Sequence, residues 1–154
     1  MTQTGIHKAG ARLTLKSELA DLALVRPWVD VLAAENSIPP NIVYAINLCL
    51  EEALSNVIRH GYSGQPGRSL TIDFASSAPG AVALTIEDSA PPFQPVEPSA
   101  PAAPVSLEDL QPGGQGLRLL RKFSQALTWE PLPRGNRLTI GFSFPPPNPP
   151  PSVV

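Results

Sequence analysis

Five stretches of the chain carry the apolar and polar patterning of short β-strands, and the first of them alternates strictly. Two pairs of these stretches are separated by turn-forming residues, Ala78-Pro79-Gly80 and Arg134-Gly135-Asn136. Each pair is therefore predicted to form an antiparallel hairpin. The predicted strands are 11–16, 69–76, 81–88, 126–130 and 137–144.

Two longer stretches place apolar residues every three or four positions, which predicts amphipathic helices. The first would begin at Ser17 as N-cap and run to about Glu35, with Pro27 bending it or marking its weak point. The second would cover 41–60, with Asn41 as its cap. The apolar stripes are Leu19, Leu22, Val25, Val29 and Leu32, then Ile42, Ile46, Cys49, Ala53 and Val57.

A third helix is predicted after Gly113-Gly114-Gln115-Gly116, which gives the order β-α-α-β-β-α-β-β. This order predicts an α+β two-layer sandwich, with helices on one face of a mixed, mostly antiparallel sheet.

Proline divides the chain into regions. Of 20 prolines in 154 residues, seven lie in 90–112 and six in 145–151. The rest of the chain has an ordinary proline content. We therefore expect a disordered N-terminus over 1–10, one domain over 11–144 with a proline-rich insert at about 89–112, and a disordered proline-rich tail over 145–154. The tail could also serve as a polyproline ligand.

Charge narrows the class of protein. Eleven basic and 13 acidic residues give a net charge of −2, which argues against a nucleic-acid-binding face.

No apolar run reaches the length of a membrane span, so we expect a cytoplasmic protein that does not enter a membrane. Only 16% of residues are charged, so a partner could cover part of the surface. Cys49, the single cysteine, has no disulfide partner in the chain.

The second helix carries a candidate site. Glu52, Asn56 and His60 are spaced four apart and would share one helical face. A carboxylate can accept a proton from an attacking hydroxyl, and an amide oxygen is a suitable ligand for Mg²⁺. The same spacing is also compatible with an ordinary solvated stripe opposite the core.

Two further segments could contact a nucleotide. Asp88 ends a strand and could accept a hydrogen bond from an exocyclic amine, or it could simply form a turn. The glycines of 113–116 open a helix, where backbone N–H groups can approach phosphates. Glycine at a helix entry is by itself weak evidence.

Together, these segments resemble the GHKL ATPase/kinase superfamily. The order is a Glu…Asn…His helix, a strand ending in Asp, a flexible insert and a glycine-rich helix entry. Within it, the chain is most similar to the anti-sigma regulatory factor serine/threonine kinases, the RsbW-like and SpoIIAB-like proteins. The motifs that carry the resemblance are EALSNVIRHGY at 52–62, GGQGLRLLRKF at 113–123 and GNRLTI at 135–140.

This resemblance implies a set of roles. Glu52 would be the general base, Asn56 the Mg²⁺ ligand and Asp88 the acceptor for the adenine amine of ATP. The insert at 89–112 would be the ATP lid. The remaining implied nucleotide contacts are His60 near the phosphates, Thr139 near the adenine, Ala90, Gly113, Gly114, Gly116 and Leu117. The family would further imply a homodimer that binds a sigma factor and phosphorylates a STAS-domain antagonist.

One position departs from the family pattern. Asp-x-Gly is usual after the strand, whereas this chain has Asp88-Ser89-Ala90. A methyl group there could obstruct a backbone conformation or the approach of the nucleotide. Two alternatives to a kinase therefore stay open: a partner-binding module of the same fold with little or no activity, and an ATPase without a protein substrate.

Overall fold

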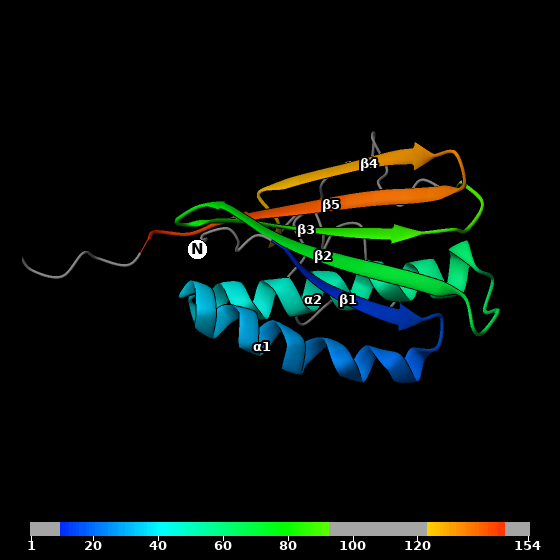
Figure 1. Cartoon of the computed structure of the whole chain (residues 1–154), viewed down its shortest axis with the longest axis horizontal. Helices are drawn as coiled ribbons and strands as arrows, with labels where there is room; N and C mark the ends of the chain where they lie inside the picture. The colour runs from blue at the N-terminus through cyan, green and yellow to red at the C-terminus, as the bar shows by residue number, and fades with distance from the viewer. Residues whose placement is uncertain (1–9, 93–122, 147–154) are drawn as a thin grey trace, which may run out of the picture.

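The computed structural model of the chain describes residues 10–92 and 123–146. They form five strands and a helical layer (Figure 1). The strands are β1 (Ala11–Lys16), β2 (Ser69–Ala78), β3 (Ala81–Asp88), β4 (Ala126–Leu132) and β5 (Gly135–Ser143). The helices are η1 (Leu19–Leu24, 3₁₀), α1 (Val25–Asn36), α2 (Pro40–Asn56) and η2 (Val57–Gly61, π).

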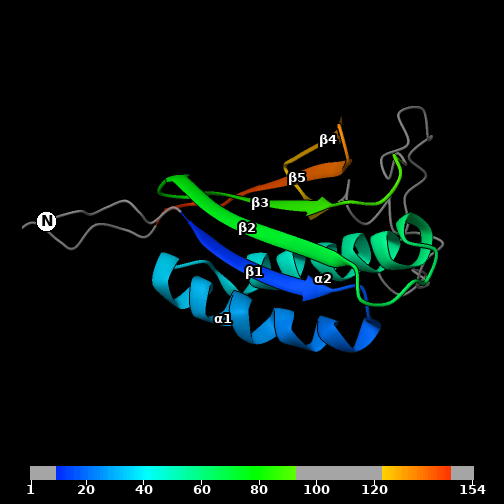
Figure 2. The same ribbon diagram turned by 45° about the vertical axis from the view of Figure 1, so that its right-hand side comes forward.

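The strands make one sheet in the order β1-β2-β3-β5-β4, and all four pairings are antiparallel. Both α-helices lie on the same face of this sheet, as Figures 1 and 2 show from two directions. The predicted α+β two-layer sandwich is confirmed. Within the described residues the sheet contains no parallel pair.

The core lies between the two layers. Even-numbered residues of β3 and β5 face the helices and are buried, as the alternation of a pleated sheet requires, and so do Leu70, Ile72 and Phe74 of β2. α2 packs its apolar stripe onto them, and Cys49, Leu50 and Leu54 have no exposed surface. In the described part of the chain, no helix is long and apolar enough to cross a membrane.

The first helical segment begins differently from the prediction. Ser17 is not a helix cap: its hydroxyl donates to the carbonyl of Gln65 at 2.6 Å and accepts from the N–H of Arg68 at 2.9 Å. Ser17 therefore ties the loop after η2 to the end of β1. The 3₁₀ geometry gives way to α-helix at Val25, so Pro27 lies in the first α-helical turn, where its missing N–H leaves no bond unmade.

The start of α2 also differs. The sequence predicts Asn41 as the cap of this helix, but Pro39 is the N-cap and Pro40 the first helical residue. Proline suits the first position because its fixed φ is already helical and its nitrogen needs no partner there.

One of the two hairpin turns is displaced from its predicted place. The β2–β3 turn lies at Pro79-Gly80, as predicted, and Gly80 has a φ of +82°. The second turn is Pro133-Arg134, because Gly135 already pairs with Leu132 and Asn136 with Pro131. Asn136 is therefore a residue of β5, and its side chain belongs to the face that looks toward the helices.

Candidate functional site

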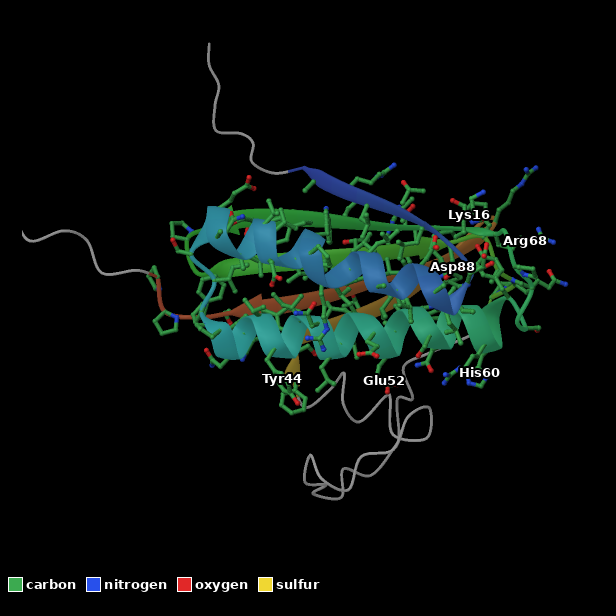
Figure 3. All side chains as sticks on the ribbon, turned by 90° about the horizontal axis from the view of Figure 1, so that it is seen from below. Lys16, Tyr44, Glu52, His60, Arg68 and Asp88 are labelled. Atoms are coloured by element: carbon green, nitrogen blue, oxygen red, sulfur yellow. The ribbon has the colours of Figure 1, made fainter. Side chains whose placement is uncertain are left out.

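The predicted catalytic stripe lies on the C-terminal half of α2 and on η2. Glu52 is half-buried, Asn56 is 9% exposed and His60 is exposed. Figure 3 shows Glu52 and His60 on one side of the helix, the side away from α1. The helix α2 thus carries a carboxylate and an amide one turn apart.

The helix changes geometry just after Asn56. Residues 57–61 form a π-turn, in which the N–H of Tyr62 bonds to the carbonyl of Val57 at 2.8 Å. Such turns are rare and frequently occur at functional sites. The wider turn changes the direction in which His60 projects from that of a continued α-helix.

Tyr62 connects this helix end to the end of β3. Its side chain is 5% exposed. The hydroxyl donates to the carbonyl of Ser69 and accepts from the N–H of Ser89, both at 2.7 Å. The C-terminal ends of α2 and β3 thereby lie at one end of the molecule (Figure 1). Tyr62 belongs to the motif at 52–62, but the sequence alone assigns it no role.

Asp88 is the buried acid of this region, with 7% of its surface exposed. Its Oδ1 accepts two hydrogen bonds at 2.9 Å, from the N–H of Ala90 and from Nδ2 of Asn136. Burial raises the pKa of Asp88, and these two hydrogen bonds act against that rise. Asp88 thus forms the turn that the sequence allows, through the N–H of Ala90, and its carboxylate is also held by Asn136.

Ala90 has an ordinary backbone conformation. Among the described non-glycine residues, only Ser37 and Ser63 have a positive φ. Ala90 is 1% exposed and belongs to the hydrophobic core cluster. The methyl group thus causes no backbone strain at this position.

Asn136 and Trp129 are two further site residues that the sequence does not predict. Asn136 is 2% exposed, and its Oδ1 accepts from Nε1 of Trp129 at 3.2 Å. Its Nδ2 also lies 3.3 Å from the carbonyl oxygens of Ala90 and Pro91. Turn propensity places Asn136 in a turn; its position one residue after Gly135 in the family motif is the signal that could have found it.

Gly135 permits this arrangement. Its φ is +146°, and a Cβ atom here would overlap the backbone carbonyl of Asp88. Only glycine brings the start of β5 this close to the end of β3.

Thr139, the predicted adenine contact, lies apart from this group. It pairs with Thr85, and the two hydroxyl oxygens lie 3.5 Å apart. Because side chains alternate along a strand, Thr139 faces the side of the sheet opposite to Asn136 and Asp88. The predicted phosphate contacts Gly113, Gly114, Gly116 and Leu117, and nearly all of the predicted lid, lie outside the described residues.

A family model described as a histidine kinase-like ATPase domain matches residues 15–142. The chain belongs to this family. It is also 32% identical over 114 residues to the serine/threonine-protein kinase BtrW of Bordetella bronchiseptica, an alignment covering 73% of this chain and 79% of that protein.

A solved structure of a histidine kinase is similar in fold. It is the histidine kinase domain of the blue-light activated histidine kinase EL346 from Erythrobacter litoralis, with a TM-score of 0.52 and 15% identity. The match covers 90% of this chain and 65% of that domain, so the chain spans slightly less than two thirds of it.

The residues of this histidine kinase-like domain are compatible with ATP and Mg²⁺. No cluster of three or more His, Cys, Asp or Glu suited to a metal occurs in residues 10–92 and 123–146. Mg²⁺ bound with a nucleotide needs few protein ligands, because phosphate oxygens and waters complete its shell. A single amide oxygen such as that of Asn56 meets this need, and Asp88 offers a buried acceptor to a base.

Proposed function

We propose that this histidine kinase-like domain is an ATP- and Mg²⁺-dependent protein serine/threonine kinase that acts as an anti-sigma factor. It would phosphorylate a STAS-domain antagonist and sequester a sigma factor, as a homodimer in the cytoplasm. The observation that carries the proposal is the combination of the Glu52–Asn56 pair on α2 with the buried Asp88 at the end of β3. The similarity to BtrW, itself a serine/threonine kinase by name, supports the phosphotransfer activity.

Each residue has a defined chemical task in this proposal. Asp88 accepts a hydrogen bond from the adenine amine and so selects the base. The amide oxygen of Asn56 contributes to holding Mg²⁺, which neutralises charge on the phosphates. Glu52 accepts the proton of the attacking serine hydroxyl. His60, exposed one turn beyond Asn56, would contact the phosphate end.

The main alternative is a partner-binding module without phosphotransfer. It is motivated by Ala90 in place of glycine. In the structure the methyl group is buried in the core and the backbone is unstrained. This packing removes backbone strain at Ala90 as an argument against the kinase, and nucleotide titration distinguishes the two proposals.

Calorimetric titration with ATP and ADP, with and without Mg²⁺, tests the nucleotide site. A micromolar dissociation constant corresponds to about −8 kcal/mol and is readily measured. We expect ATP binding to be strengthened by Mg²⁺ and weakened at least ~10-fold in Asp88→Asn, since a hydrogen bond to a charged group is lost. Asp73→Asn, on the opposite face of the sheet, is the matched control. No binding at millimolar ATP would refute the proposal.

The kinase step is tested separately with Glu52→Gln and a STAS-domain protein as substrate. Phosphate transfer should fall by at least ~10²-fold while ATP affinity is retained, because only proton acceptance is removed. Equal loss of transfer and of ATP affinity would give Glu52 a structural role. ATP turnover that is unaffected by the STAS protein would favour an ATPase without a protein substrate.

A further inference from the structure

A chain of side-chain hydrogen bonds crosses three strands and ends on Asp88. Nε1–H of Trp129 on β4 donates to Oδ1 of Asn136 on β5, and Nδ2 of Asn136 donates to Oδ1 of Asp88 on β3. The distances are 3.2 and 2.9 Å. Trp129 is half-buried on the outer strand, whereas Asn136 and Asp88 are buried at 2% and 7% exposure.

The chain of bonds has a direction that defines the orientation of the Asn136 amide. An indole N–H can only donate, so the atom of Asn136 that faces Trp129 must be the oxygen. The amide nitrogen then necessarily points at Asp88 and at the carbonyls of Ala90 and Pro91. A flipped amide would place an oxygen against three acceptors and leave the indole N–H without its bond.

The same bonds distinguish the two oxygens of Asp88. Oδ1 receives the Asn136 amide and the N–H of Ala90. Residues 10–92 and 123–146 supply no hydrogen-bond donor to Oδ2. A carboxylate oxygen can accept more than one hydrogen bond, so Oδ2 has the capacity to accept a donor from a bound molecule.

We infer that Trp129 and Asn136 are positioning residues that aim Oδ2 of Asp88 at the exocyclic amine of a purine and so determine selectivity for an amine over a carbonyl at that position. The inference rests on the proposed nucleotide site and deepens it. Neither residue would contact the base, because the protein itself engages both polar atoms of the Asn136 amide.

The chemistry of the base supplies the selectivity. ATP presents an amine to a carboxylate oxygen, which forms a charge-assisted hydrogen bond. ITP presents a carbonyl at the same place, so two acceptors would face each other and Asp88 would lose its donor. A site built around a hydrogen bond discriminates strongly against an analogue that lacks it. This discrimination requires the carboxylate to be held in one orientation.

The test compares the dissociation constants of ATP and ITP for the full chain and for Trp129→Phe. The substitution keeps an aromatic ring on β4 and removes the indole N–H. We expect the wild-type protein to prefer ATP by at least ~10-fold. In Trp129→Phe the affinity for ATP should fall roughly 5-fold, the worth of one neutral hydrogen bond, with little change for ITP. The ATP/ITP ratio therefore falls.

Two further variants serve as controls for the effect of Trp129→Phe on the ATP/ITP ratio. Trp28→Phe makes the same substitution on α1, where Trp28 packs against the core from the helical layer, and should keep the wild-type ratio. Asn136→Leu removes the whole amide and should lower the ratio further than Trp129→Phe does. Urea unfolding of each variant shows whether it is folded under the conditions of the titration.

Each outcome decides between the proposals. Equal weakening of ATP and ITP in Trp129→Phe, or an unchanged ratio, would overturn the positioning role while leaving the nucleotide site intact. A wild-type protein that binds both equally would overturn the selectivity of Asp88. A wild-type protein that binds neither would overturn the proposed function itself, together with this inference.

Discussion

At the scale of single residues, the buried carboxylate of Asp88 can accept a hydrogen bond from a ligand, but its ionisation destabilises the fold. Burial raises its pKa above the ordinary 3.8, and the hydrogen bonds from Asn136 and Ala90 oppose that rise only in part. The folded protein therefore holds a proton on Asp88 more tightly than the unfolded chain does. Such a group stabilises the fold below its ordinary pKa, and the contribution is lost as pH rises through the raised value.

This sign gives a pH prediction for Asp88→Asn. The variant lacks the ionisation, so its free energy of unfolding, relative to wild type, should be greater at pH 7 than at pH 3.5. The Tyr62 hydroxyl, which lies near Asp88, does not titrate in this window, because burial raises its pKa above the ordinary 10. The Glu87–Arg137 pair faces the opposite side of the sheet.

Urea unfolding of both proteins at the two pH values measures this difference. Subtracting one protein from the other cancels the titration of all carboxylates that they share. If the difference in free energy of unfolding between the two proteins is the same at both pH values, or smaller at pH 7, then ionisation of Asp88 does not destabilise the fold.

At the scale of elements, the start of β5 is the most constrained backbone of the site. Gly135 combines a φ of +146° with a contact so close that a Cβ would overlap the carbonyl of Asp88. Gly135→Ala should therefore lower the free energy of unfolding by about 2–4 kcal/mol, which is in the range of strained or overpacked positions.

The matched control is Gly64→Ala. Gly64 also has a positive φ, +76°, but a Cβ there meets nothing within 4 Å. The substitution should cost only about 1 kcal/mol, as expected for a left-handed conformation. Equal losses in the two variants would mean that the contact with Asp88 adds nothing, and nucleotide titration of folded Gly135→Ala would then show whether Asp88 is displaced.

Elements are predictable from the sequence where one pattern dominates. The apolar stripe of α2 and the alternation of β2 and β3 each repeat over several residues, so one exception cannot hide them. Caps and turns depend on one or two residues. Local sequence favours Ser17 as a cap, although its actual role depends on the carbonyl of Gln65, 48 residues away.

In the candidate site, too, residues that belong to a sequence motif are predictable, and residues placed by a single turn are not. Glu52, Asn56 and Asp88 lie in motifs and can be found from them. Asn136 is not predicted, because the turn propensity of Arg134-Gly135-Asn136 does not reveal that Gly135 already pairs in β5. The motif does not reveal that Thr139 faces away from Asp88, because a motif gives spacing but not the face of the sheet that a residue occupies.

At the scale of the whole molecule, the site and the core share one helix. α2 presents Glu52 to one side and buries Cys49, three residues earlier, with no exposed surface. Burial raises the pKa of Cys49 to about 12. The thiol is therefore unreactive in the folded protein, because it is inaccessible and because it stays protonated. Cys49 is the only cysteine in the chain, so reaction of the protein with a thiol reagent reports only the exposure of this buried side chain.

Labelling of Cys49 therefore measures how nucleotide binding is coupled to the fold. In the absence of ATP, the labelling rate should rise with urea in parallel with global unfolding, because the two layers must separate to expose the thiol. A ligand that binds only the folded state reduces the open population by the factor 1 + [L]/Kd. Labelling should therefore slow about 100-fold with ATP at 100 times its Kd. Asp88→Asn, measured at the same ATP concentration, should show a smaller slowing in proportion to its weaker binding. Rapid labelling that ATP does not change would show that α2 lifts from the sheet by itself, and the helix that carries Glu52 and Asn56 would then not be the rigid support that phosphotransfer requires.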